Sequence, residues 1–269
     1  MAVLIIAASK SDVDVMKKVA ATIEKSGIKC VIRVCSAHRT PELLDRIMGD
    51  VEHAEIEKER YDAIIAGAGL AAALPGVVAA KTTLPVIGVP LTGAFEGLDA
   101  LLSIIQMPPG IPVLTTGVNN SEEAAAAAIK IVRNIAKKVN ITTQNSKNQK
   151  AVDKAAETLK QLGIPYGCSG KTEKDSINLC FVDVNEKQVA ATNELTIYCP
   201  TAVKETAADA VKLLQLTKKG VWAGLNRGDN AAVAAAEIMK LDSKLKEYRW
   251  DMRRKVEEAD KAARGASEQ

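Results

Sequence analysis

Short apolar segments alternate with amphipathic ones along this chain, and that alternation restricts the possible folds more than any other feature. Residues 2–8 form a β-branched apolar run, which predicts a strand buried on both faces. The next segment, up to Gly27, has apolar side chains at the three- and four-residue spacing of a helix: Val13, Met16, Ala20 and Ile23. A strand followed by a helix, repeated, predicts a parallel sheet joined by right-handed crossovers.

The same pattern continues through the first half of the chain. Further apolar runs predict strands at residues 28–34, 62–66, 83–89 and 111–116, with Pro90 closing the third of these. Helices are expected after Thr40, over residues 97–106 and from Ala124. The predicted fold class is α/β: a three-layer αβα sandwich with a parallel, flavodoxin-like or Rossmann-like sheet.

The second half of the chain repeats this order of elements. The stretch around Gly27 resembles that around Gly163, residues 84–87 resemble residues 195–198, and the alanine-rich helix from Ala124 resembles one from Ala231. We therefore predict two tandem repeats, residues 1–138 and 139–269. From Lys244, a charged helix carries an apolar stripe that we expect to pack on a neighbouring repeat or subunit.

Composition excludes several classes of protein. A net charge of +3 and an aromatic content of 3% give no basic or stacking surface for nucleic acid. No window resembles a membrane span, and the first residues resemble a strand more than a signal peptide, so we predict a cytoplasmic protein. Five cysteines without C-x-x-C spacing are typical of reduced thiols and give no zinc site.

The stretch Ser36-Ala37-His38-Arg39-Thr40-Pro41 is the strongest candidate for a functional site. Thr40 and Pro41 suit the N-cap and first position of a helix, which places His38 and Arg39 in the turn after a strand. Ligands of parallel α/β sheets bind at the carboxyl ends of the strands. An imidazole beside a guanidinium can move a proton next to an anion. The alternative is a histidine that packs or caps locally.

Two further loops should meet at the same edge of the sheet. Ser9, Ser11 and Asp12 follow the first strand, where a helix N-terminus and hydroxyl groups can bind phosphate; simple helix capping by Ser11 or Asp12 is the alternative. Residues 67–76, Gly-Ala-Gly-Leu-Ala-Ala-Ala-Leu-Pro-Gly, form a loop whose small residues let the backbone approach a ligand.

Several of these stretches together resemble one family, the 5-(carboxyamino)imidazole ribonucleotide mutases of purine biosynthesis, which are catalytic subunits of phosphoribosylaminoimidazole carboxylase. The resemblance covers residues 2–135 strongly and residues 140–260 as a degenerate second copy. The matching segments include Ser9-Lys10-Ser11-Asp12, residues 36–41, residues 66–76, Gly97-Leu98-Asp99, and residues 103–113 around Gln106-Met107-Pro108.

The resemblance implies an isomerase that moves a carboxyl group from nitrogen to carbon C4 of an aminoimidazole ribonucleotide, through transient carbon dioxide and without metal or organic cofactor. His38 would move the proton, and Arg39 would bind the phosphate. Substrate contacts would also come from Ser9, Ser11, Asp12, Ser36, Gly67, Gly69 and Leu74. The role requires a group with a pKa near 7, which is typical of an imidazole.

The sequence departs from the family pattern at three places. Ala8 stands where the family has glycine, Ala73 where it has a second histidine, and Thr92-Gly93 where a Gln-Ser pair is common. Two alternatives therefore stay open: an aminoimidazole ribonucleotide carboxylase that uses carbon dioxide directly, and a non-catalytic ribonucleotide-binding or assembly protein.

The resemblance also implies a homo-oligomer, because the family is typically octameric with sites between subunits. Two repeats in one chain could replace two subunits, so we expect a tetramer of two-repeat chains. The second repeat carries Asn145, Lys147 and Asn148 at the positions of Ser9, Ser11 and Asp12, and Lys174 at that of His38. Only the first repeat is therefore expected to bind substrate.

Overall fold

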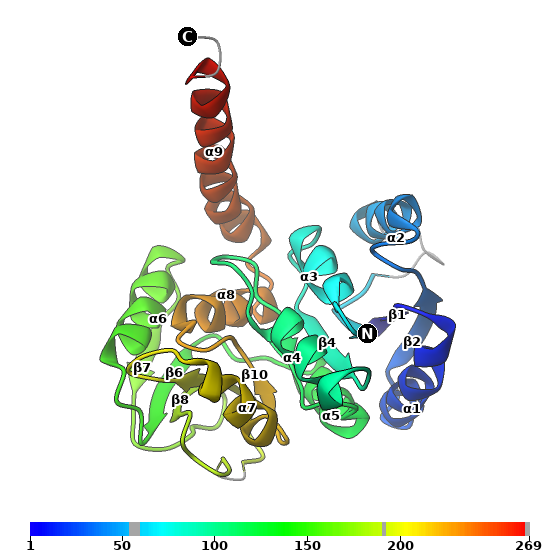
Figure 1. Cartoon of the computed structure of the whole chain (residues 1–269). Helices are drawn as coiled ribbons and strands as arrows, with labels where there is room; N and C mark the ends of the chain where they lie inside the picture. Colours follow the sequence, from blue (N-terminus) through cyan, green and yellow to red (C-terminus); the bar gives the residue numbers. More distant parts are fainter. Residues whose placement is uncertain (54–59, 190–191, 267–269) are drawn as a thin grey trace.

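The computed structural model describes residues 1–53, 60–189 and 192–266 of the chain (Figure 1). Ten strands form one sheet in the order β2-β1-β3-β4-β5-β10-β9-β8-β6-β7. Every neighbouring pair is parallel except β5 and β10, which pair antiparallel through Thr115 and Trp222. The prediction of a mostly parallel α/β sheet is confirmed, and the single antiparallel pair lies where the two halves of the chain meet.

The first half contains five strands and five α-helices in the described residues. The strands are β1 (Ala2–Ala7), β2 (Lys29–Val34), β3 (Ala63–Gly69), β4 (Val86–Leu91) and β5 (Leu114–Thr115). The helices are α1 (Val13–Glu24), α2 (Pro41–His53), α3 (Ala73–Ala80), α4 (Leu98–Ile105) and α5 (Ser121–Val132). Short 3-10 turns precede α1 and α4, at Lys10–Asp12 and Phe95–Gly97.

The second half has the same strand order with fewer helices. Its strands are β6 (Val139–Gln144), β7 (Tyr166–Cys168), β8 (Ile177–Asp183), β9 (Thr196–Thr201) and β10 (Val221–Trp222). Its helices are α6 (Gln149–Gln161), α7 (Ala207–Leu216) and α8 (Gly228–Ile238), followed by α9 (Asp242–Ala266). Within the described residues, no helix follows β7 or β8, where the first half has α2 and α3.

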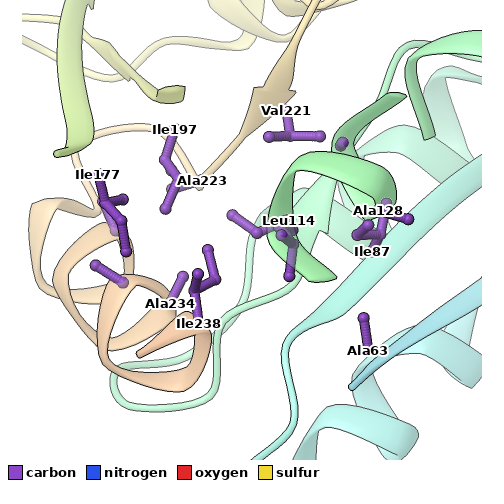
Figure 2. Close-up of a cluster of buried hydrophobic side chains, with 14 of the residues drawn as sticks. Ala63, Ile87, Leu114, Ala128, Ile177, Ile197, Val221, Ala223, Ala234 and Ile238 are labelled. Atoms are coloured by element: carbon purple, nitrogen blue, oxygen red, sulfur yellow. The ribbon is translucent and has the colours of Figure 1, made fainter. Parts of the chain in front are cut away.

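Helices cover both faces of the sheet, which gives three layers. On one face a continuous apolar core runs through both halves, from α1 and α5 to α6 and α8. Figure 2 shows part of it, with Ala63, Ile87 and Leu114 from the first half in one cluster with Val221, Ala223 and Ile238 from the second. On the opposite face, α2, α3 and α4 cover the first half, and Trp222 is buried with residues of α4 and α7.

The two halves make equivalent hydrogen bonds at their junction. Gly110, with φ +83°, donates its N–H to Oδ1 of Asn230 in α8; Gly220, with φ +79°, donates to Oε2 of Glu123 in α5. Asn230 and Glu123 are the third residues of their helices. A local two-fold relation between the halves therefore extends to single hydrogen bonds.

Helix α9 begins on the second half and then projects from the body of the molecule (Figure 1). Leu245 is fully buried in the large core, Met252 reaches Gly110 of the first half, and Val256 further along is 70% exposed. Arg249 bonds to the carbonyl groups of Gly110 and Thr82 and pairs with the buried Glu237 of α8. The N-terminal part of α9 therefore packs on the body of the molecule as predicted, and its C-terminal part does not.

Two local expectations from the sequence are wrong. Pro90 does not close β4 but lies inside it, opposite Ala68. Its missing N–H is tolerated because the short β5 forms no ladder bond at this position. Asp12 occupies the N-cap position of α1, as the capping alternative supposed, but its side chain makes no capping hydrogen bond, and its carboxylate accepts one from Ser9. The glycine-rich loop is also shorter than predicted, because β3 continues to Gly69 and α3 begins at Ala73.

Candidate functional site

The turn after β2 places His38 and Arg39 on the surface at the carboxyl edge of the sheet. Residues 37–39 form the turn, and both side chains are exposed. Thr40 closes it: the Ser36 N–H donates to Thr40 Oγ1 at 2.9 Å, and the Thr40 N–H donates to the Ser36 carbonyl at 2.9 Å. The Arg39 N–H donates to Ser36 Oγ at 3.2 Å. Hydrogen bonds among Ser36, Arg39 and Thr40 thus fix the backbone, while the side chains of His38 and Arg39 stay exposed to a ligand.

The loop after β1 forms a small hydroxyl–carboxylate cluster. Ser9 Oγ lies 2.7 Å from Ser11 Oγ and donates to Asp12 Oδ2 at 2.7 Å. Since β1 lies between β2 and β3 in the sheet, this cluster stands between the His38 turn and the end of β3. The structure therefore brings the three predicted loops to one edge of the sheet.

The glycine-rich segment contributes main-chain atoms and packing. A Cβ atom on Gly67 would lie 2.7 Å from Met16 Cε, and one on Gly69 would lie 3.2 Å from the Leu91 carbonyl oxygen, so Gly67 allows α1 to pack closely on the sheet and Gly69 allows the close approach of β4. Leu74 is 2% exposed and belongs to the core beneath α3. Its side chain is therefore unavailable to a ligand, and only its N–H, in the first turn of α3, can serve one.

Leu70 is the exposed residue of this segment. It is 60% exposed and has a left-handed backbone with φ +53°, which is unusual for a branched side chain. A Cβ atom on Gly93 would lie 3.0 Å from Leu70 Cδ2, so Leu70 contacts the loop that follows β4. Residues 92–97 are therefore a fourth loop at this edge, although only the departure of Thr92-Gly93 from the family pattern was evident from the sequence.

The site is open in a single chain. Three hollows found among the described residues lie elsewhere: about 270 Å³ beside the start of α5, about 260 Å³ between α5 and the start of β9, and about 880 Å³ between Tyr61, Leu84 and Trp250. None of the three is lined by the predicted site residues. The edge loops form a surface that a ligand can reach from solvent.

Cysteine chemistry does not take part in the arrangement of this site. Cys35 directly precedes the His38 turn, but it is 3% exposed and its burial raises the pKa of the thiol, with a smaller opposing effect from Arg33. A reactive thiolate at this position is therefore disfavoured. In the described part of the chain, no three His, Cys, Asp or Glu side chains cluster as a metal ion would require.

The corresponding edge of the second half is filled by its own side chains. Gln144 Nε2 donates to the Gln188 carbonyl at 3.0 Å, and Asn145 Nδ2 donates to Glu186 Oε1 at 2.6 Å. Asn148 is bonded to Asn226 and to the Ala202 carbonyl. Groups at the positions of the Ser9–Asp12 cluster thus bond to neighbouring loops.

Strand order 2-1-3-4-5 in each half, with exposed polar loops at the carboxyl edge of the first, defines a flavodoxin-like α/β protein. A family model described as AIR carboxylase matches residues 2–152. The chain belongs to the AIR carboxylase family. None of the helices in residues 1–53, 60–189 and 192–266 is long and apolar enough to cross a bilayer.

Relatives with assigned activities match about half of this chain. The N5-carboxyaminoimidazole ribonucleotide mutase of Methanocaldococcus jannaschii is 43% identical over 164 residues, 60% of this chain and 98% of that protein. The mutase of Pyrococcus abyssi is 51% identical over 130 residues, 48% of this chain and 71% of its own. The chloroplastic phosphoribosylaminoimidazole carboxylase of Vigna aconitifolia is 48% identical over 126 residues, 46% of this chain and 22% of its own.

A crystal structure of Treponema denticola PurE aligns with 46% of this chain and 77% of its own, with 30% identity and a TM-score of 0.41. The fold assignment above depends on the strand order and not on this alignment.

Proposed function

We propose that this protein is an N5-carboxyaminoimidazole ribonucleotide mutase of de novo purine biosynthesis. It would convert N5-carboxyaminoimidazole ribonucleotide into 4-carboxy-5-aminoimidazole ribonucleotide. The observation that carries the proposal is the exposed His38–Arg39 turn beside the Ser9–Asp12 cluster, in a chain that matches 98% of the length of a curated mutase.

The geometry suits the parts of this reaction. Arg39 is exposed and offers a forked cation to the substrate phosphate. Ser9, Ser11 and Asp12 supply donors and acceptors for the ribose, and the N–H groups at the start of α3 face the same edge. His38 can donate a proton to the nitrogen that loses the carboxyl group and later accept the proton from carbon C4. The carbon–nitrogen bond breaks to release carbon dioxide, and the ring carbon recaptures it before it diffuses away.

One site per chain follows from the difference between the halves. The second half lacks a described helix after β7 and binds its own polar side chains at the matching edge. We infer that residues 139–269 are a degenerate repeat that replaces a neighbouring subunit. In the cytoplasm, four such chains would form a tetramer with four sites, in which other copies cover the open edge. Light scattering tests this, and a stable monomer with full activity would refute it.

The test uses both candidate substrates and both histidines. Purified protein with the carbamate substrate should form the C4-carboxylated isomer, and His38→Asn should lower the turnover number by at least a hundredfold. The chain has two histidines, so His53→Asn in the exposed last turn of α2 is a matched control that should keep full activity. A wild-type protein that is inactive with the carbamate would refute the proposal.

Direct carboxylation of aminoimidazole ribonucleotide is the second candidate, because a plant carboxylase is 48% identical over 126 residues. Turnover of the unmodified ribonucleotide that rises with bicarbonate, with none on the carbamate, would favour it. Ribonucleotide binding by calorimetry without either turnover would favour a non-catalytic protein.

A further inference from the structure

The loop between β4 and α4 and its counterpart between β9 and α7 each lead to an aspartate, but the two aspartates differ in their hydrogen bonds. Asp99 near the start of α4 and Asp209 near the start of α7 stand equally far beyond the ends of β4 and β9. The chain therefore contains two versions of one loop, and the second version shows what the first lacks.

In the second half this aspartate is fully bonded. Asp209 Oδ2 accepts the Thr206 N–H at 2.9 Å and the Thr206 hydroxyl at 2.8 Å, while Oδ1 accepts from Lys212 at 2.8 Å. Thr206 has the extended backbone of an N-cap residue, with φ −132°. The hydrogen bond from Lys212, followed by those from Thr206, lowers the pKa of Asp209.

In the first half the same carboxylate lacks these bonds. Oδ1 of Asp99 is buried and has no hydrogen-bond partner among the described residues. Glu96 stands at the position of Thr206, but its backbone is left-handed at φ +57°, preceded by Phe95 at +49°. A left-handed backbone is sterically strained for residues other than glycine. An unpaired buried oxygen adds to this strain.

The loop also displays an apolar side chain beside the candidate site. Phe95 is 78% exposed, whereas the other phenylalanine, Phe181, is fully buried. Gly93 contacts Leu70 at the exposed end of the glycine-rich segment. Strained backbone, an unpaired carboxylate and an exposed aromatic ring thus coincide in the one edge loop that has no polar role in the proposed reaction.

We propose that residues 92–97 are an arm that covers the bound ribonucleotide, and that Asp99 is the positioning residue that holds the arm closed. In the closed form Glu96 becomes extended and donates its N–H to Asp99, as Thr206 does to Asp209. The left-handed residues relax, and Phe95 moves toward the ligand. The observed form is the open one. This inference depends on the proposed function, because it takes the ribonucleotide as the ligand.

Asp99→Leu separates this role from a structural one. The substitution removes a buried unpaired oxygen, so the melting temperature should stay the same or rise. The closed arm loses its hydrogen bond, so KM should rise about tenfold with kcat changed less than threefold. A residue needed only for folding would lower the melting temperature. The matched variant Asp209→Leu breaks the bonded counterpart, so it should lower the melting temperature and leave KM unchanged.

Hydrogen exchange measures the arm directly. Saturation with 4-carboxy-5-aminoimidazole ribonucleotide should slow exchange of the Glu96 amide at least fivefold in wild type and not in Asp99→Leu. Glu96→Thr, which copies the second half, should slow the same amide without ligand. If the protein binds the product by calorimetry and turns over substrate, but the Glu96 amide does not exchange more slowly with product bound, the arm is overturned and the proposed function stands.

Two other outcomes also decide the proposal. Slower exchange that depends on protein concentration and not on ligand would assign the loop to a contact between subunits and overturn the arm. Absence of both binding and turnover would overturn the proposed function, and the ribonucleotide arm with it.

Discussion

Gly228→Ala should destabilise the protein strongly, because helices α6 and α8 touch at this residue. A Cβ atom on Gly228 would lie 1.9 Å from the carbonyl oxygen of Ala151, 3.0 Å from its carbonyl carbon and 3.1 Å from Phe181 Cε1. Ala151 is 1% exposed and Phe181 is fully buried. The obstacle is backbone, so no rotamer change relieves it, and the two helices must separate by roughly 1 Å or more in a close-packed core.

The magnitude follows from the overpacking cost and a small opposing gain. Extra atoms in a packed core cost about 1–3 kcal/mol, and a backbone obstacle belongs at the upper end. Alanine in place of glycine in a helix returns roughly 0.5–1 kcal/mol. We expect a net loss of about 2–3 kcal/mol in the free energy of unfolding, a large share of the roughly 5–15 kcal/mol of a typical domain.

Urea unfolding followed by circular dichroism provides the assay, with Gly49→Ala as the matched control. Gly49 lies inside α2, and a Cβ atom there would meet nothing within 4 Å. The same substitution should therefore stabilise the protein by about 0.5–1 kcal/mol at that position. A Gly228→Ala midpoint equal to or above that of wild type would refute the packing argument.

Three further predictions concern other parts of the molecule. Burial raises the pKa of Glu237 to about 8, and the nearby Arg249 opposes this shift only in part. Between about pH 4.5 and pH 8 the folded state therefore holds a proton that the unfolded state releases. Stability should therefore fall as pH rises from about 4.5 to about 8, and Glu237→Gln should flatten that slope in melting curves; an unchanged slope would contradict this. Leu70→Gly should raise the free energy of unfolding by about 0.5–1 kcal/mol, because glycine adopts the left-handed backbone without strain and the leucine side chain is mostly exposed. A lower urea midpoint for this variant would argue against strain at Leu70. A thiol reagent should modify Cys168, the exposed cysteine, well before the buried ones, and Cys168→Ser should remove the fast phase seen by mass spectrometry; a fast phase that survives would show that a buried thiol is accessible.

The order of elements was predictable from the sequence because each depends on local patterns. The helical spacing from Val13 to Ile23 gave α1, and Met16, Ala20 and Ile23 are buried as predicted. Pro41 begins α2 as expected, which placed His38 and Arg39 in the turn after β2. Strand ends were less predictable, since the pairing partners decide where a strand stops: β3 runs on to Gly69 because β4 pairs with it there.

The candidate site was predictable as a set of loops and not as a shape. Sequence placed Ser9, Asp12 and His38 after adjacent strands, because polar residues after apolar runs are a local signal. It did not indicate that the side chain of Leu74 is buried, since an apolar residue after a glycine-rich stretch has no pattern that reveals its direction. It named Asp99 only as part of the matching segment Gly97-Leu98-Asp99 and did not indicate that one carboxylate oxygen is buried without a partner, whereas its counterpart Asp209 stands in a Thr-x-x-Asp sequence typical of a helix start.

The sequence alone determined the α/β class, the repeated order of strands and the residues able to carry acid–base chemistry, because apolar periodicity and turn residues act over a few neighbours. Only the tertiary structure decided that the two halves meet through the antiparallel pair β5 and β10, that one core runs through both, and that Asp99 is left unpaired while Asp209 is bonded. These features depend on which distant segments pack together, and each is fixed by contacts between residues far apart in the chain.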